Sequence, residues 1–139
     1  MSDRMERLKR VGRGALRRCP RCGHRDVFTG YFSLRHHCPS CGFLFEREEG
    51  YWVGAMIVNI AVTEAAFAAV FLGGMLATWP DVPWTALLVA GLVVNGLLPI
   101  VFYPLSKTIW LGVDLYFNPP TVAEEATAET QRQVPDEDG

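Results

Sequence analysis

Two long apolar stretches interrupt an otherwise polar chain of 139 residues. The first runs from Trp52 to Thr78 with Glu64 as its one formal charge, and the second runs from Trp84 to Tyr103 with none. Each reaches the about 20 apolar residues that a helix needs to cross a bilayer. A chain this short has too little other material to cover two such helices on all sides. The pattern therefore predicts two membrane-spanning helices, at residues 52–78 and 84–103.

A short linker, WPDVPW, joins the two stretches, and its prolines end the first helix and start the second. Residues 50–103 are therefore predicted to form an antiparallel helical hairpin. Trp52, Trp79, Trp84 and Tyr103 stand at the four helix ends, where amphipathic rings favour the headgroup level of a bilayer.

The segments that flank the hairpin are polar. Residues 1–16 form a basic arm with apolar residues at helical spacing, which favours an interfacial helix on anionic lipid over a nucleic-acid arm. Residues 104–118 repeat helical spacing over too few positions to cross again, and they predict an amphipathic helix in the membrane interface. Residues 119–139 are acidic and lack aromatic side chains, which predicts a disordered tail.

Formal charge is segregated along the chain. Residues 1–50 carry eleven basic and six acidic side chains, residues 51–120 carry one and three, and residues 121–139 carry one and six. An excess of Lys and Arg stays on the cytoplasmic side of a membrane, so we expect both termini in the cytoplasm. The basic start also lacks the apolar core of a secretory signal.

All four cysteines lie in two Cys-x-x-Cys pairs, Cys19 with Cys22 and Cys38 with Cys41. Fifteen residues separate the pairs, which is inside the spacing of structural zinc sites. A proline within each pair presets the turn between the two ligands, and a glycine follows each pair where the chain must bend back. Four thiolates suit tetrahedral zinc and leave no open coordination position, so the set favours a structural site over a catalytic one.

Other chemistry at the same cysteines is weighed against zinc. A rubredoxin-like iron centre uses an identical ligand set and stays open as an alternative, as does a copper site. Disulfides are disfavoured in a reducing cytoplasm. A c-type haem is excluded, because His24 lies one position too late after the first pair. His36 and His37 are interpreted as solvent-facing residues in preference to substitute ligands.

The region between the cysteine pairs has the composition of short strands. Apolar residues flank a turn at residues 29–30, so residues 17–49 predict a small zinc-ribbon-like β module with a hairpin and a further strand at residues 43–45. So little apolar material cannot support a core alone, and metal binding would supply the folding energy. We expect Arg17 and neighbouring basic side chains to offset the charge of the thiolates. The aromatic side chains expected at the surface, as contacts for a partner, are Phe28, Tyr31, Phe32 and Phe43.

Glu64 is the one charged residue within either predicted span. About 12 residues into its helix it lies ~18 Å deep, where a carboxylate costs several kcal/mol. In one interpretation the protonated carboxyl hydrogen-bonds Asn95, or an equivalent residue of a second copy of the chain. In the other, Glu64 handles protons or cations, which requires partners because two helices cannot enclose a pathway.

The order of these features resembles a bacterial family of membrane proteins, domain of unknown function 983. The matching segments are CPRCG at 19–23, FTGYFSLRHHCPSCGF at 28–43, FERE directly after it and PLSKTIWLGVDL at 104–115. The resemblance extends over about residues 17–118. It implies a small multi-pass protein of the bacterial inner membrane with no assigned activity. Genes of the family neighbour cytochrome oxidase assembly genes in some bacteria, which implies a respiratory complex as a candidate partner.

The fold class expected from the sequence is a membrane α-helical hairpin preceded by a small cytoplasmic zinc-ribbon-like β module. Nothing in the sequence assembles a nucleophile, a base and an oxyanion site, so we expect no enzyme. We expect an interaction or assembly module that binds the bilayer and another membrane or cytoplasmic protein, without nucleic acid. A homo-oligomer is a candidate assembly. A redox or metal-delivery component with iron or copper is the alternative.

Overall fold

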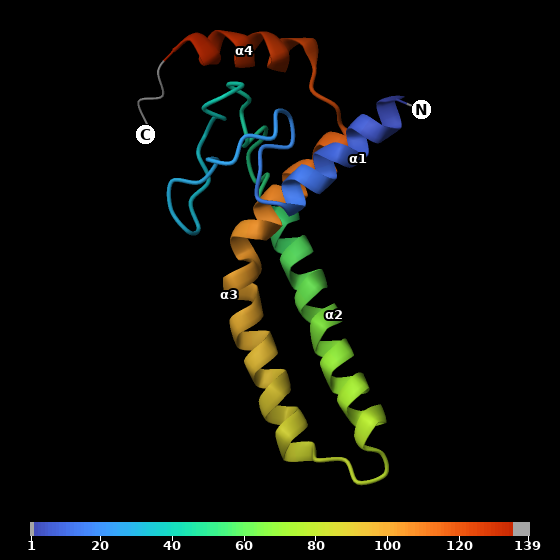
Figure 1. The fold of residues 1–139 in the computed structure, drawn as a ribbon. Helices are drawn as coiled ribbons and strands as arrows, with labels where there is room; N and C mark the ends of the chain where they lie inside the picture. The colour runs from blue at the N-terminus through green and yellow to red at the C-terminus, as the bar shows by residue number, and fades with distance from the viewer. Residues whose placement is uncertain (1, 135–139) are drawn as a thin grey trace.

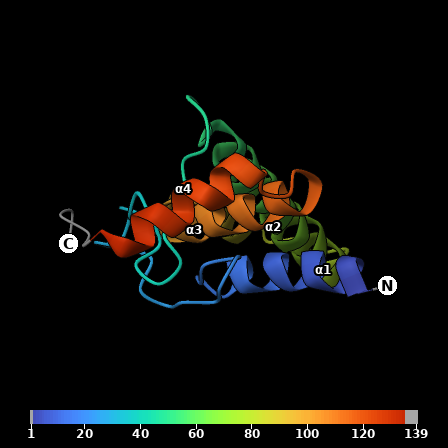
Figure 2. The ribbon, with the colours of Figure 1, turned by 90° about the horizontal axis from the view of Figure 1, so that it is seen from above.

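The computed structural model describes residues 2–134. Its helices are α1 (Ser2–Ala15), α2 (Val53–Thr78), α3 (Trp84–Phe117) and α4 (Val122–Gln133). Helices α2 and α3 form a long antiparallel hairpin, and the other elements gather at the end opposite the α2–α3 connection (Figure 1). We call this end the head; it comprises α1, residues 16–52, residues 104–117 of α3, and α4. Viewed from above, α4 covers the head and α1 runs along one side (Figure 2).

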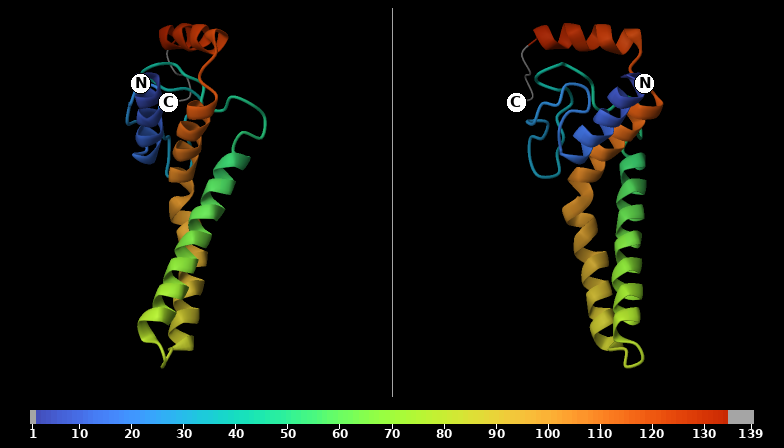
Figure 3. Two further views of the ribbon diagram at one scale, coloured as in Figure 1. Left: turned by 90° about the vertical axis from the view of Figure 1, so that its right-hand side faces the viewer. Right: turned by 45° about the vertical axis from the view of Figure 1, so that its right-hand side comes forward.

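The predicted hairpin is confirmed as two helices that are long and apolar enough to cross a membrane. Below the head these helices stand alone (Figure 3), and large apolar side chains such as Ile57 and Leu92 are 63% and 65% exposed. The two helices approach closely at glycines: a Cβ at Gly91 would lie 2.8 Å from the ring of Phe67. The hairpin therefore presents an apolar outer surface that a lipid environment would cover.

Helix α3 continues without a break from the hairpin into the head. The sequence predicted a span that ends at residue 103 and a separate interfacial helix at 104–118, but Pro99 and Pro104 both lie inside one helix. Proline removes a helical hydrogen bond and is tolerated where neighbouring groups support the backbone. The Tyr31 hydroxyl donates to the Val101 carbonyl (2.8 Å), so the loop between the cysteine pairs contacts α3 three residues before Pro104. The apolar pattern becomes one-sided after Pro104 because α3 enters the head there.

Helix α1 packs against the head end of α3 through two glycines. A Cβ at Gly112 would lie 2.9 Å from the carbonyl oxygen of Arg10, and a Cβ at Gly14 would collide with the Thr108 carbonyl. Glycine weakens an isolated helix, but it also lets two helix backbones come together. Gly14 therefore lowers the helix propensity of the basic arm and also allows α1 to pack closely on α3.

Arginines of α1 also reach the end of α3. The Nη1 atoms of Arg7 and Arg10 donate to the carbonyls of Tyr116 and Leu115, each at 3.5 Å. These carbonyls belong to the last turn of α3, where the helix dipole favours positive charge. Two of the basic side chains that were predicted to contact anionic lipid therefore contact α3 of the same chain.

The tail does not match the predicted disorder over its described part. Residues 122–133 form α4, and residues 135–139 lie outside the described residues. Thr121 and Glu124 form a reciprocal capping box at its start, which is a local helix signal. Ala128 of α4 is buried and lies directly against Gly42 of the second cysteine pair. The prediction of disorder rested on the acidic composition of the whole tail. The capping box and the buried contact involve only a few of its residues, so they hardly change that composition.

The predicted β module folds without strands in residues 2–134, with two isolated bridges, Phe28 to Leu34 and His37 to Leu44. Tight turns at the cysteine pairs and at residues 29–33 interrupt the chain too often for a ladder to extend. Its buried residues join those of α3 and α4 in one cluster, which consists of Cys19, Val27, Cys38, Phe43, Phe45, Tyr51, Leu111, Leu115 and Ala128. Phe43, which we expected at the surface, is 1% exposed.

Candidate metal centre

The two Cys-x-x-Cys pairs adopt the same turn. The N–H groups of Gly23 and Gly42 donate to the carbonyls of Cys19 and Cys38, both at 2.8 Å. The N–H groups of Cys19 and Cys38 in turn donate to the carbonyls five positions later, at 2.9 and 3.0 Å. Gly23 and Gly42 have φ values of +82° and +69°, a region that side chains disfavour. The predicted role of the glycines, to bend the chain back after each pair, is confirmed.

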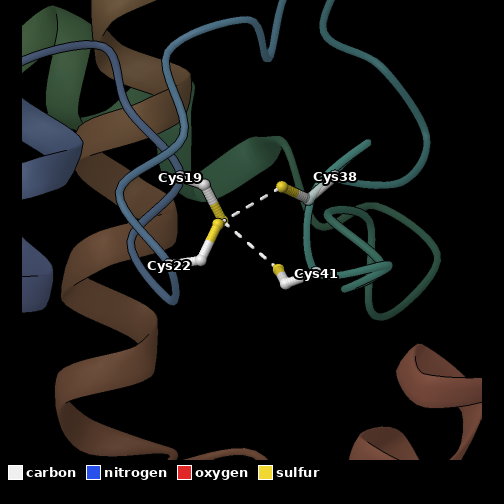
Figure 4. A group of neighbouring side chains, drawn as sticks. All are labelled: Cys19, Cys22, Cys38 and Cys41. Atoms are coloured by element: carbon white, nitrogen blue, oxygen red, sulfur yellow. Dashed lines mark hydrogen bonds between the residues drawn. The ribbon is translucent and has the colours of Figure 1, made fainter. Parts of the chain in front are cut away.

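These turns bring all four sulfur atoms together from two separate loops (Figure 4). The Sγ atoms lie within 4.8 Å of one another. The Cys19–Cys41 sulfurs are 3.8 Å apart and the Cys22–Cys38 sulfurs are 3.5 Å apart. Four thiolates placed ~2.3 Å from a tetrahedral zinc ion are about 3.8 Å apart. The four predicted ligands therefore form a group that could hold one metal ion, and His36 and His37 are not part of it.

The group has a buried side and an open side. Cys19 is 0% exposed and Cys38 is 2% exposed, and both belong to the core cluster of the head. Cys41 is half-buried and Cys22 is exposed. A metal held here would cross-link the two loops inside the core of the head, with Cys22 as the one ligand exposed at the surface.

Hydrogen bonds between the thiols distribute the charge unevenly. The neighbouring Cys19 thiol lowers the pKa of Cys22 and of Cys41. The pKa of Cys19 is raised by its three cysteine neighbours and by burial. Thiolates crowded at these distances repel one another, so a divalent cation is the natural replacement for the shared protons.

Arginines near Arg17 contact the turns of the cysteine pairs, whereas Arg17 itself takes another partner. Arg21 donates to the Cys41 carbonyl (3.3 Å), and Arg13 donates to the Arg21 carbonyl (2.9 Å). Arg17 instead lies over the ring of Phe28, 4.6 Å from its centroid, in a cation–π contact. The positive charge near the centre therefore comes from α1 and from within the pair itself.

A comparison with known families places the chain. The family described as "Protein of unknown function (DUF983)" matches residues 28–115, which is more than half of the chain. The chain belongs to this family. The DUF983 match includes Cys38 and Cys41 but begins after Cys19 and Cys22, so it is shorter than the range expected from the sequence. No curated protein and no solved structure matched the chain.

A cluster of hydrogen-bonded charged residues that the sequence did not reveal joins the DUF983 range to α4. Arg47 donates to both carboxylate oxygens of Glu124 (2.6 and 2.9 Å) and to Asp114 (2.7 Å). The Tyr51 hydroxyl donates to the same Asp114 oxygen (2.9 Å). We call these four residues the Arg47 cluster; it joins the loop before α2 to α3 and α4. The FERE and GVDL segments contained Arg47 and Asp114, but nothing local pairs residues 67 positions apart.

Protonation in the Arg47 cluster follows from these contacts. The Arg47 side chain and the Asp114 side chain are each 11% exposed. Hydrogen bonds from Arg47 lower the pKa of Glu124 to about 2, so this carboxylate stays charged. Burial and the neighbouring Asp114 carboxylate raise the pKa of Tyr51, so its hydroxyl stays protonated and able to donate.

Polar groups within the DUF983 hairpin take partners other than the predicted ones. Asn59 donates to the Pro99 carbonyl across the hairpin (3.0 Å). Asn95 donates to the Gly91 carbonyl of its own helix (3.2 Å), and Glu64 lies exposed on the outer face of α2. The expected Glu64–Asn95 pair within one chain is therefore wrong. The hydrogen bond by which Asn59 joins the two helices was not predicted from the sequence.

Proposed function

We propose that the chain is an integral protein of the bacterial inner membrane, with its head in the cytoplasm and a structural zinc ion on Cys19, Cys22, Cys38 and Cys41. Its function is non-enzymatic: the head is an interaction or assembly module held at the membrane surface. The observation that carries this proposal is the shared core. Cys19 and Cys38 belong to the same buried cluster as Leu111 and Leu115 of α3, so a bound ion would order the head on the helix that anchors it.

Zinc and the cytoplasmic side have separate support. Four sulfur ligands complete a tetrahedral shell, and such closed sites contribute folding energy and leave no position for a substrate. The basic residues before α2 favour retention on the cytoplasmic side. The candidate partner is another membrane or cytoplasmic protein, and the family resemblance implies a respiratory complex.

The proposal is tested by side-specific labelling and metal analysis of one preparation. Cysteine is introduced at Ser2 (Ser2→Cys) or in the exposed α2–α3 connection (Asp81→Cys), and intact cells are treated with a membrane-impermeant maleimide. Asp81→Cys should label in intact cells, whereas Ser2→Cys should label only after permeabilisation, with the unsubstituted chain as background. Purified protein should contain one zinc per chain. Labelling of Ser2→Cys in intact cells would reverse the proposed topology.

The alternative function, redox or metal delivery, is favoured by one observation, the exposure of Cys22. An exposed thiolate gives a bound iron or copper ion a route to an acceptor. A coloured preparation with stoichiometric iron would decide for this alternative, and so would transfer of copper to an acceptor that requires Cys22. Colourless zinc protein decides against it.

Glu64 favours a partner within the membrane, and we propose a second copy of the chain. A protonated carboxyl can both donate and accept, so two Glu64 side chains can satisfy each other across a symmetric contact. Hydrogen bonds between membrane helices contribute about 1–2 kcal/mol, so Glu64→Leu should weaken self-association roughly tenfold. Glu64→Gln keeps a donor and an acceptor and should retain most of it.

Self-association is measured by energy transfer between labelled copies in vesicles, with Leu92→Ala on the exposed face of α3 as the control. Equal association of Glu64→Leu and the unsubstituted chain would remove the second copy as the partner. A proton or cation flux through vesicles that Glu64→Gln abolishes would assign Glu64 to an ion path instead.

A further inference from the structure

A cavity of about 590 Å³ lies where the hairpin meets the head. We call it the junction cavity; its lining includes Arg35, His36, Glu46, Trp52, Tyr103 and Lys107. They come from the loop between the cysteine pairs, the segment before α2, and α3 on both sides of Pro104. The volume is within the range of about 300–1,000 Å³ that small-molecule sites occupy.

Aromatic residues give the level of the junction cavity along the hairpin. Trp52 directly precedes α2, and Tyr103 ends the apolar stretch of α3. The loop tip reaches the same level, since the Tyr31 hydroxyl bonds the Val101 carbonyl and the Phe32 ring lies 6.3 Å from that of Tyr103. Amphipathic aromatic rings collect at the headgroup region of a bilayer. A membrane that covers the hairpin therefore has its headgroups at the mouth of this cavity.

Lys107 supplies a fixed positive charge in the cavity. Its Nζ atom donates to the Phe32 carbonyl (3.0 Å) and lies 5.2 Å and 5.0 Å from the rings of Trp52 and Tyr103. These contacts hold the ammonium in place, yet an ammonium has three N–H groups and this hydrogen bond uses one. The remaining two can donate to a ligand.

Arg35 adds a second cation, and Glu46 adds one carboxylate. Arg35 donates from Nη2 to Asp26 (3.3 Å), while its Nε is buried and has no hydrogen-bond partner among the described residues. A guanidinium has five N–H groups and the bond to Asp26 uses one, so Arg35 can also donate to a ligand in the cavity. His36 also lines the cavity, and the two cations Lys107 and Arg35 outnumber the one lining carboxylate, Glu46. These charged residues favour a ligand that has an anionic group for Lys107 and Arg35 and a separate hydrogen-bond donor for Glu46.

We propose that the junction cavity binds a phospholipid headgroup, with Lys107 and Arg35 on the phosphate and Glu46 accepting from a hydroxyl or ammonium group of the headgroup. Phosphatidylglycerol and phosphatidylethanolamine both have this chemistry, whereas phosphatidylcholine has no donor on its headgroup. The inference rests on the membrane location proposed above and adds a ligand to it. Basic pockets on the cytoplasmic side of membrane helices are suited to lipid headgroups. A lipid bound there would connect the loop of the head to α3.

The test uses the full chain, purified with its metal in detergent, freed of lipid and mixed with equal amounts of the three phospholipids. Native mass spectrometry then counts the retained molecules. We expect one phosphatidylglycerol or phosphatidylethanolamine per chain and roughly tenfold less phosphatidylcholine, the effect of a hydrogen bond of about 1.5 kcal/mol. Lys107→Ala and Arg35→Ala should each lower retention roughly tenfold, and Lys107→Arg should restore it. Lys9→Ala, at an exposed lysine of α1, is the control and should retain lipid normally.

Metal content per chain shows whether each variant still folds. If Lys107→Ala loses its metal, the other two variants decide: the site is supported when Arg35→Ala retains less lipid than Lys107→Arg. Equal lipid retention by the folded variants and the unsubstituted chain would overturn the headgroup site, as would retention of inorganic phosphate in place of any lipid. A chain that leaves the membrane fraction on alkaline washing would refute the proposed membrane location itself. A chain that stays there without lipid selectivity refutes only the ligand.

Discussion

Replacing Cys38 with alanine should unfold the head and leave the hairpin helical. Cys38 is 2% exposed and shares the core cluster with Phe43 and Phe45. A structural zinc site contributes about 10–16 kcal/mol of binding free energy, comparable to the about 5–15 kcal/mol that stabilises a whole domain. Hydrogen exchange should therefore show loss of protection across residues 17–52 and in α4. The amides of α2 and α3 within the hairpin should stay protected, because their hydrogen bonds are internal to each helix.

Two controls separate metal loss from damage to the turn. Ser40→Ala changes an exposed residue between Cys38 and Cys41 and should bind metal and protect the head as the unsubstituted chain does. A strong chelator, added to the unsubstituted chain, should reproduce the exchange pattern of Cys38→Ala. A head that remains protected after the metal is removed would show that its own packing is sufficient, and the structural role of the ion would be lost.

The parts of the fold that the sequence predicted correctly have local signals. Twenty consecutive apolar residues identify a long helix whatever surrounds it. The convergence of the four cysteines was also predictable, because each pair has its own turn, with Gly23 and Gly42 at positive φ. The fifteen residues between the pairs are enough to bring one turn next to the other.

The errors arise where contacts between distant residues override local preference. Residues 27–34 have the composition of strands but form one isolated bridge. Two hydrogen bonds tie this loop to α3, one from Tyr31 to the Val101 carbonyl and one from Lys107 of α3 to the Phe32 carbonyl. The helix of the basic arm was predicted, but its contact with α3 at Gly14 was not. The Arg47 cluster joins residues far apart in sequence, so no pattern along the chain could pair them.

Replacing Arg47 with methionine should release α4 from the head. The change leaves Asp114, whose side chain is 11% exposed, without a cationic partner, and breaking such a buried pair costs about 3–5 kcal/mol. Glu124 is 30% exposed and can turn to water, so most of the loss falls on Asp114. We expect faster hydrogen exchange in α4 and faster metal loss to a chelator, since Ala128 of α4 covers the second cysteine pair at Gly42.

The matched control is Lys9→Met, which removes a lysine from an exposed ion pair with Glu6 at a similar distance, 3.0 Å. Exposed pairs contribute about 0–1 kcal/mol, so α4 exchange and metal retention should stay close to those of the unsubstituted chain. If Arg47→Met behaved like Lys9→Met, the Arg47 cluster would not be what fastens α4.

The Arg47–Glu124 contact should also give the docking of α4 a defined pH dependence. Hydrogen bonds from Arg47 lower the pKa of Glu124 from 4.5 to about 2 in the folded chain. A lowered carboxyl pKa contributes stability that is fully present above pH 4.5 and is lost as the pH falls toward about 2. The comparison is therefore between the unsubstituted chain and Glu124→Gln, which cannot ionise.

The difference in α4 protection between these two proteins should be constant from neutral pH down to about pH 5 and then shrink as Glu124 takes up a proton. Protonation of the cysteine thiolates at low pH weakens metal binding in both proteins, so it largely cancels in the difference. A difference that stayed constant down to pH 3 would mean that the Glu124 carboxylate does not contribute its charge to the cluster. Its contribution would then come from packing and from the capping box with Thr121.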